Sequence, residues 1–151
     1  MSKVCTAADA VKLIKDGDTV SVAGFVGLAN PEEVLAEIEN QFVETGHPQQ
    51  LFLAYAAGQG DGKDKSLNHF GREGLVRRIV GGHYNLAPKL GKLNIDNKVE
   101  AYNFPQGVIM HLFRNIAAGK PGLCTHVGLK TFVDPRMEGG KLNEVTKEDL
   151  V

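Results

Sequence analysis

The segment Asn103-Phe104-Pro105-Gln106-Gly107 joins a short apolar run to a helical pattern, and its residue types suit the binding of an anion. Backbone N–H groups in the first turn of a helix have no partner inside the helix, and the helix dipole makes that end positive. Gln106 adds an uncharged side-chain donor at the same place. We therefore take Asn103, Gln106 and Gly107 as candidate ligands for a substrate carboxylate or a developing oxyanion. The alternative role for Gln106 is a first-turn residue that is hydrogen-bonded to its own helix.

A second turn, in the sequence VSVAGFVGLANPEEV from Val20 to Val34, also lies between an apolar run and a helical pattern. Gly24 and Gly27 permit positive φ and allow the backbone to approach a ligand closely. We expect Gly24, Phe25 and Gly27 to lie near the substrate. The residues alone support a tight, well-packed crossover as an equally good reason for the two glycines.

Other known motifs of nucleotide, hydrolase and metal sites do not fit. The stretch GQGDGKDKS at 58–66 resembles a phosphate loop, but Ala57 and Asp64 stand where the Walker pattern needs glycine and serine or threonine. The turn at Gly24 and Gly27 lacks the first glycine of a dinucleotide-binding triplet. The chain has no G-x-S-x-G or H-E-x-x-H motif, and its five histidines are scattered, so we predict no metal site.

Composition describes an ordinary globular protein. The 151 residues are 42% hydrophobic and 23% charged with a net charge of −1, which favours neither nucleic acid nor a membrane surface as partner. Two cysteines without paired spacing predict neither a disulfide framework nor a zinc site, so a cytoplasmic location is expected. Eight lysines and arginines against three acids at 63–98 raise a further question. Arg72, Arg77 and Arg78 are candidate phosphate contacts or surface charges on a short helix.

Strand-like and helical patterns alternate along the chain. Strands are predicted at 19–25, 51–57, 79–83, 99–104 and, more weakly, 129–133, and helices at 6–17, 31–46, 71–78, 86–97 and 105–119. Thr6 is the expected N-cap of the first helix, Asn30 that of the second, with Pro31 at its first position and Glu33 completing a capping box. The alternation predicts one α/β domain with a mainly parallel sheet and flanking helices. The two turns would then line one edge of that sheet.

The sequence DGDTVSVAGFVGLANPEEV resembles the N-terminal signature of family I coenzyme A transferases. The signature is an Asp-Gly pair, an apolar strand, Gly24-Phe25, a glycine-rich turn with Gly27, and Pro31. EGLVRRIVGGHYNLAPKLGKL, NKVEAYNFPQG and VGLKTFVDPRMEGGKLNEVTKEDLV resemble the single-chain, propionate and acetate CoA-transferase-like branch. The resemblance implies a CoA-transferase-like fold of the phosphosugar isomerase-like superfamily, present here incompletely.

The resemblance also implies a reaction. CoA moves between a short-chain acyl-CoA and a free carboxylic acid, as in short-chain fatty acid and ketone body metabolism, so the CoA thioester is a substrate and no bound cofactor is expected. A glutamate attacks the thioester and becomes a glutamyl-CoA thioester, while Gln106 contacts the acyl carbonyl or carboxylate. That glutamate belongs to a Glu-x-Gly-x-x-Gly turn in the second half of the family's chains. Glu138-Gly139-Gly140 comes nearest here, but Asn143 replaces the last glycine, so no catalytic residue is expected in this chain.

We therefore expect residues 1–151 to be the N-terminal part of a CoA-transferase domain, truncated at its C-terminal end near Leu150-Val151. Such a chain would need its missing second half or a partner subunit, would form a homo-oligomer, and would be inactive alone. The alternatives are a non-catalytic acyl-CoA-binding or interaction module, or a phosphosugar isomerase-like domain. The isomerase would need a lysine or acid dyad beside a phosphate loop, which the sequence lacks.

Overall fold

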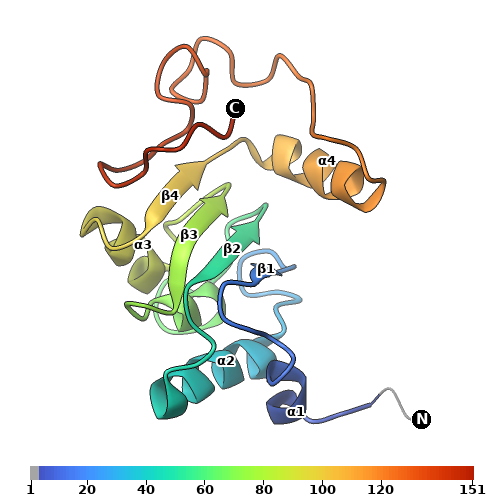
Figure 1. The fold of residues 1–151 in the computed structure, drawn as a ribbon, viewed down its shortest axis with the longest axis vertical. Coiled ribbons are helices and arrows are strands. Elements are labelled where there is room, and N and C mark those ends of the chain that lie inside the picture. Colours follow the sequence, from blue (N-terminus) through green and yellow to red (C-terminus); the bar gives the residue numbers. More distant parts are fainter. Residues whose placement is uncertain (1–3) are drawn as a thin grey trace.

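A four-stranded parallel sheet with the strand order β1-β2-β3-β4 is the centre of the fold (Figure 1). The computed structural model describes residues 4–151. The predicted α/β class with a parallel sheet is confirmed. In chain order the elements are α1 (Ala7–Val11), β1 (Thr19–Ser21), α2 (Glu32–Thr45), β2 (Leu51–Tyr55), the 3-10 helix η1 (Ser66–Phe70), β3 (Val76–Gly81), α3 (Pro88–Ile95), β4 (Glu100–Asn103) and α4 (Gln106–Ala117).

Alternating side chains of the strands pack into two separate hydrophobic cores, one on each face of the sheet. Leu53 and Ile79 belong to the larger core, which also holds residues of α2, η1 and α3. Their neighbours Phe52 and Val80 point the other way and pack in a second core with Ile109 of α4. The strands are therefore buried on both faces, as expected for a parallel sheet. Helix α4 covers the face opposite to α2 and α3.

Of the two predicted helix N-caps, Thr6 and Asn30, the structure contains only the first. Thr6 caps α1 as predicted, because its hydroxyl accepts a hydrogen bond of 3.1 Å from the N–H of Asp9. The prediction that Asn30 caps the second helix is wrong, because α2 begins at Glu32 after Pro31 and has no side-chain cap. Asn30 instead donates its side-chain amide to the carbonyl of Val26 at 2.9 Å. Its side chain closes the preceding turn, so the expected capping box does not form.

The helix predicted at 71–78 is also wrong, since β3 begins at Val76 and the helical turn lies earlier, in η1. Glycine is unfavourable inside a helix, and Gly74 has a φ of +92° that a helix does not allow. Leu75, Val76, Ile79 and Val80 are all buried, which identifies a strand covered on both faces. The first helix is shorter than predicted too, because α1 ends at Val11.

The outer edge of β4 is covered by the segment that follows α4. The N–H of Asn103 donates to the carbonyl of Gly140 at 2.8 Å, and Leu142 donates to Ala101 at 2.9 Å. Lys141 forms an antiparallel bridge with Tyr102. The strand predicted at 129–133 does not form, and those residues are in turns. A short pairing at 141 thus covers the edge instead.

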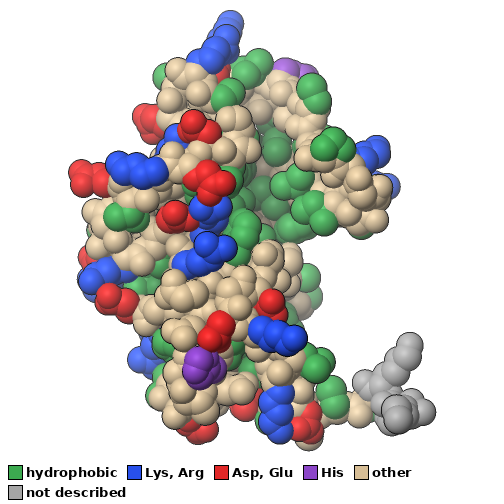
Figure 2. All heavy atoms as spheres, viewed as in Figure 1, with side chains coloured by type: hydrophobic (Ala, Val, Ile, Leu, Met, Phe, Trp, Pro, Cys, Tyr) green, Lys and Arg blue, Asp and Glu red, His purple; other side chains and the backbone are tan. Residues whose placement is uncertain are grey.

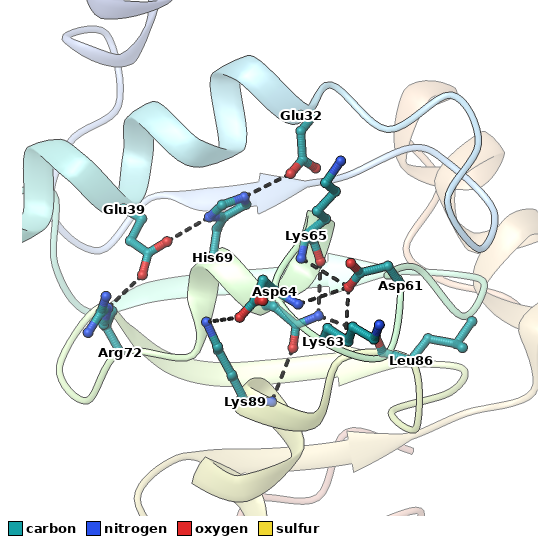
Figure 3. Close-up of polar contacts among 11 residues, drawn as sticks. Glu32, Glu39, Asp61, Lys63, Asp64, Lys65, His69, Arg72, Leu86 and Lys89 are labelled. Atoms are coloured by element: carbon teal, nitrogen blue, oxygen red, sulfur yellow. Dashed lines mark hydrogen bonds and ion pairs between the residues drawn. The ribbon is translucent and has the colours of Figure 1, made fainter.

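A charged network fastens the connection between β2 and β3 to helix α2 (Figure 3). The ring nitrogens of His69 lie 2.6 Å from Glu39 and 3.0 Å from Glu32, and both carboxylates belong to α2. Glu39 also accepts from Arg72 at 2.6 Å, and Glu32 accepts from the backbone N–H of Ser66 at 2.8 Å. These bonds fix the loop that continues from the carboxyl end of β2.

We expect Glu39→Gln to destabilise the fold at neutral pH and to do so less in acid. Burial raises the pKa of Glu39, but hydrogen bonds from His69 and Arg72 outweigh it, so its pKa lies below the usual value. A lowered folded-state pKa contributes stability above the ordinary pKa, and this is lost as pH falls through the folded value. The expected loss is about 1–3 kcal/mol at pH ~7, measured by urea unfolding.

The exposed Glu44 on the same helix provides the control, and Glu44→Gln should leave the urea midpoint within experimental error. The difference between the parent and Glu39→Gln should shrink between pH ~7 and pH ~3, because the carboxylate loses its charge as pH falls through its lowered folded-state pKa. A difference that is the same at both pH values would show that the charge of Glu39 does not stabilise this connection.

Candidate active site

The segments that follow the four strands meet at the carboxyl edge of the sheet, as parallel pairing requires. The turn after β1 is joined to the loop after β2, because Val26 donates to Gly58 at 2.7 Å and accepts from Gly60 at 2.8 Å. Gly82, after β3, lies between the segment that follows β2 and the start of α4, which follows β4. A Cβ atom on Gly82 would come within 2.1 Å of the Ala56 carbonyl oxygen and 3.6 Å of the Gln106 Cα. The first residue of α4 is therefore packed directly over this edge.

In the glycine turn after β1, only one of the two glycines has a backbone conformation that requires glycine. Gly24 has a φ of +139°, and a Cβ atom there would lie 2.2 Å from the Oδ1 atom of Asn30. Gly27 does not have positive φ, and a Cβ atom on it would meet no atom within 4 Å. Val26 and Ala29 take the left-handed conformations instead, with φ of 54° and 56°. The turn therefore uses the positive φ that glycine permits at Gly24 and not at Gly27.

At the second turn, the amide of Asn103 has a structural partner and that of Gln106 does not. Asn103 donates its side-chain amide to the carbonyl of Gly81 at 2.9 Å, which ties the ends of β3 and β4 together. Gln106 and Gly107 are exposed in the first turn of α4. Among the described residues, 4–151, the side chain of Gln106 has no hydrogen-bond partner. Its amide thus stays available beside the positive end of a twelve-residue helix.

An apolar cavity of about 300 Å³ opens between the glycine turn and α4. Figure 2 shows hydrophobic side chains gathered in a hollow beside helix α4. The cavity is lined by Ser21, Val22, Ala23, Gly24, Ala56, Ala57, Gln59, Met110 and Phe113. It therefore places residues of the glycine turn, of the loop after β2 and of α4 around one space.

Gln59 is the buried polar residue of this cavity wall. Its side chain is 2% exposed and donates from Nε2 to the carbonyl of Val22 at 2.8 Å. Its Oε1 atom has no hydrogen-bond partner among the residues that the structure describes. Sequence analysis missed Gln59, Met110 and Phe113, although the spacing of Met110 and Phe113 from Gln106 already indicates a shared helix face.

The arginines considered as phosphate contacts lie on β3 and before it, not on a helix. Arg78 pairs with Glu100 and Glu148 and stacks over Phe52 and Tyr102 at 5.9 and 5.8 Å. The hydrogen bond that Arg78 donates to Glu100 raises the pKa of Arg78 against the effect of burial. Arg72 is paired with Glu39, as described above. Arg77 is exposed in a polar groove at the amino ends of β3 and β4, the edge opposite to the candidate site.

The turn at Glu138 reaches the same edge of the sheet. Gly140 accepts the hydrogen bond from the N–H of Asn103, so the Glu138–Gly140 turn lies beside the end of β4, with Glu138 exposed.

Within residues 4–151, no group of three or more His, Cys, Asp or Glu side chains could hold a metal ion. In the same range, no helix combines the length and the apolar character that crossing a membrane requires.

This arrangement offers an exposed amide donor at the start of α4 and an apolar space lined by the same helix, which suits a ligand with a polar and an apolar part. Comparison with known proteins gives the site a context. The family model for coenzyme A transferase matches residues 4–149. Caffeate CoA-transferase of Acetobacterium woodii is 49% identical over 152 residues, covering 100% of this chain and 29% of that protein.

A solved structure and a subunit of a two-chain enzyme are also similar. The crystal structure of the acyl-CoA transferase YdiF from Escherichia coli O157:H7 has a TM-score of 0.95 and 39% identity, over 97% of this chain and 29% of that one. The acetate CoA-transferase subunit alpha of Escherichia coli K12 is 26% identical over 88% of this chain and 57% of the subunit. The chain thus spans less than a third of the two long relatives and over half of the subunit. The match of the family model to nearly all of its residues shows that this chain belongs to the coenzyme A transferase family.

Proposed function

We propose that this chain is the first part of a transferase that moves CoA between a short-chain acyl-CoA and a free carboxylic acid. The observation that supports this function is the unpaired amide of Gln106 at the positive end of α4, over the carboxyl edge of the sheet. Family membership supports the reaction class, and the CoA thioester is its substrate.

In the proposed reaction the nucleophilic glutamate comes from residues outside this chain. Its carboxylate oxygen attacks the thioester carbonyl carbon, the C–S bond breaks, and CoA leaves as a thiolate. The glutamate and the acyl group are then joined in a mixed anhydride. The thiolate then attacks the glutamyl carbonyl, which releases the first acid and leaves a glutamyl-CoA thioester. The second acid reverses these steps and carries CoA away.

The residues of this chain bind and stabilise rather than react. Each attack places negative charge on a carbonyl oxygen, and an amide donor at a helix N-terminus stabilises such an oxyanion. Gln106 and the N–H groups of Gln106 and Gly107 are the donors that we assign to this role. The turn at Gly24 and Phe25 forms the opposite side of the site, and Asn103 holds the second turn in position.

A graft tests this function directly. Residues 1–151 would replace the matching segment of the Acetobacterium woodii caffeate enzyme, which covers this whole chain at 49% identity. We call this protein the graft. It should transfer CoA from acetyl-CoA to propionate with ping-pong kinetics, because the glutamyl-CoA enzyme forms before the second acid binds. A graft that melts cooperatively but transfers CoA to no acid would contradict the proposed function.

We further expect the isolated chain to be inactive and to associate. Within residues 4–151 the outer edge of β1 has no strand beside it, and free strand edges recruit other chains. Apolar side chains, among them Met110, Ile116 and Met137, are more than half exposed. Light scattering should give a mass above that of one chain, and the CoA-exchange assay should show no turnover. A monomer with turnover would contradict both, and Glu138 would then be the residue to replace.

The surroundings of the enzyme follow from the same proposal. The partner is the second half of the catalytic unit, either in the same polypeptide or as a separate subunit, and copies of the unit form a homo-oligomer. The enzyme works in the cytoplasm on soluble acids and CoA esters.

A further inference from the structure

One face of α4 connects the polar start of the helix with the apolar cavity. Gln106, Met110 and Phe113 are separated by four and three residues, which places them on the same side of an α-helix. At 1.5 Å of rise per residue, this face runs about 10 Å from Gln106 to Phe113. Met110 and Phe113 line the cavity, and Gln106 lies one helical turn before Met110, at the start of the same helix.

The cavity has the composition of a pocket for a hydrocarbon group. None of its nine lining residues carries a charge, and most of its wall is Val22, Ala23, Ala56, Ala57, Met110 and Phe113. Its volume of about 300 Å³ is at the small end of the range for small-molecule sites. A carboxylic acid has an anionic head and an apolar remainder, which matches a polar helix start that continues into an apolar space.

The unpaired Oε1 atom of Gln59 indicates that the cavity wall contacts a hydrogen-bond donor when a ligand is bound. A buried acceptor without a partner costs free energy, so such groups are rarely left unmatched. The hydrogen bond from Gln59 Nε2 to the carbonyl of Val22 holds the amide in the orientation that leaves Oε1 unpaired. A hydroxyl or a water molecule that accompanies a bound acid could donate to it, and a purely packed wall would not need the amide.

We propose that this cavity holds the hydrocarbon part of the acyl group, and that Met110 and Phe113 of α4 set the size of the acids that the enzyme accepts. This inference rests on the proposed function and adds a specificity determinant to it. The acid lies along the face of α4, with its carboxylate at Gln106 and its chain against Met110 and Phe113.

A matched pair of tryptophan variants of the graft tests the inference. Met110 is 52% exposed at the cavity wall, so Met110→Trp narrows the cavity without adding volume to a packed core. Ile116, 63% exposed on the same helix, does not line the cavity, and Ile116→Trp controls for the added ring. The measurement is kcat/KM for hexanoate divided by kcat/KM for acetate, with acetyl-CoA or propionyl-CoA as donor.

Met110→Trp should lower the hexanoate-to-acetate ratio by about tenfold or more, because a pocket discriminates between acids by their apolar fit. Ile116→Trp should leave the ratio unchanged. Ala57→Leu, which narrows the cavity from the opposite wall, should lower the ratio as Met110→Trp does. Thermal melts of all three variants confirm that the fold is retained.

The outcomes separate this inference from the proposed function. Transfer to no acid by the unsubstituted graft would contradict the proposed function itself. Transfer with the same ratio in Met110→Trp, Ala57→Leu and Ile116→Trp would overturn the acyl pocket alone. It would mean that residues from outside this chain fill the cavity in the assembled enzyme. An unsubstituted graft that uses acetate and rejects hexanoate would overturn it as well.

Discussion

Replacing Gln106 with alanine is expected to lower kcat of the graft by about 100- to 1000-fold while leaving its thermal melt unchanged. The loss follows because the removed amide is a donor to the oxyanion that forms in each attack on a carbonyl. A preorganised donor in a site shielded from water stabilises that charge far more than the ground state. The fold should be unaffected because the side chain is exposed and has no hydrogen-bond partner among residues 4–151.

The exposed His111 on the same helix supplies the control, since His111→Ala should change neither kcat nor the melting temperature. Gln106→Glu is a more demanding variant, because it keeps the shape and replaces the donor with a negative charge. It should be at least as slow as Gln106→Ala. Unchanged kcat/KM in Gln106→Ala would end the oxyanion role and leave Gln106 as an ordinary first-turn residue.

Gly24→Ala is expected to destabilise the protein by about 3 kcal/mol or more, whereas Gly27→Ala should cost less than about 1 kcal/mol. Gly24 has a φ of +139°, a conformation that residues with a side chain rarely adopt, and its added Cβ would lie 2.2 Å from Asn30 Oδ1. Gly27 has neither constraint, so an alanine there meets open space. Urea unfolding of both variants, side by side, measures the difference.

This pair also tests what the glycine turn does for the reaction. Gly24 lines the cavity, so a graft with Gly24→Ala that still folds should transfer CoA more slowly than a graft with Gly27→Ala. Equal midpoints for the two variants would mean that the turn can relax around the new methyl group. Equal stability together with equal kcat/KM would remove Gly24 from the site.

Several features of the fold were predictable because they depend on neighbouring residues. The strand ending at Asn103, the helix opening at Gln106 and the turn after β1 follow from apolar runs, proline and glycine within a few residues. The buried run at 51–57 indicated a parallel strand covered on both faces. The cap of Thr6 on α1 is likewise a local pattern, and the structure confirms it.

Other predictions failed where a distant residue or an overlooked local constraint decided the outcome. Asn30 has the residue type of an N-cap, but its amide bonds Val26 instead. The run before Val76 reads as a helix until Gly74 and burial on both faces are known. Arg78 reads as a surface charge, yet it pairs with Glu148, seventy residues away. No local window contains such a partner.

The sequence by itself determined the α/β class, the parallel sheet and the place of Gln106 at a helix start, because short-range periodicity and turn chemistry specify these. Only the tertiary structure decided which residues surround the cavity: Gln59 from the loop after β2, the turn at Gly24, and Met110 from α4. It also decided that Gly24, and not Gly27, needs its missing side chain. These properties arise from contacts between segments that are far apart in the chain and meet only when the sheet aligns its carboxyl ends.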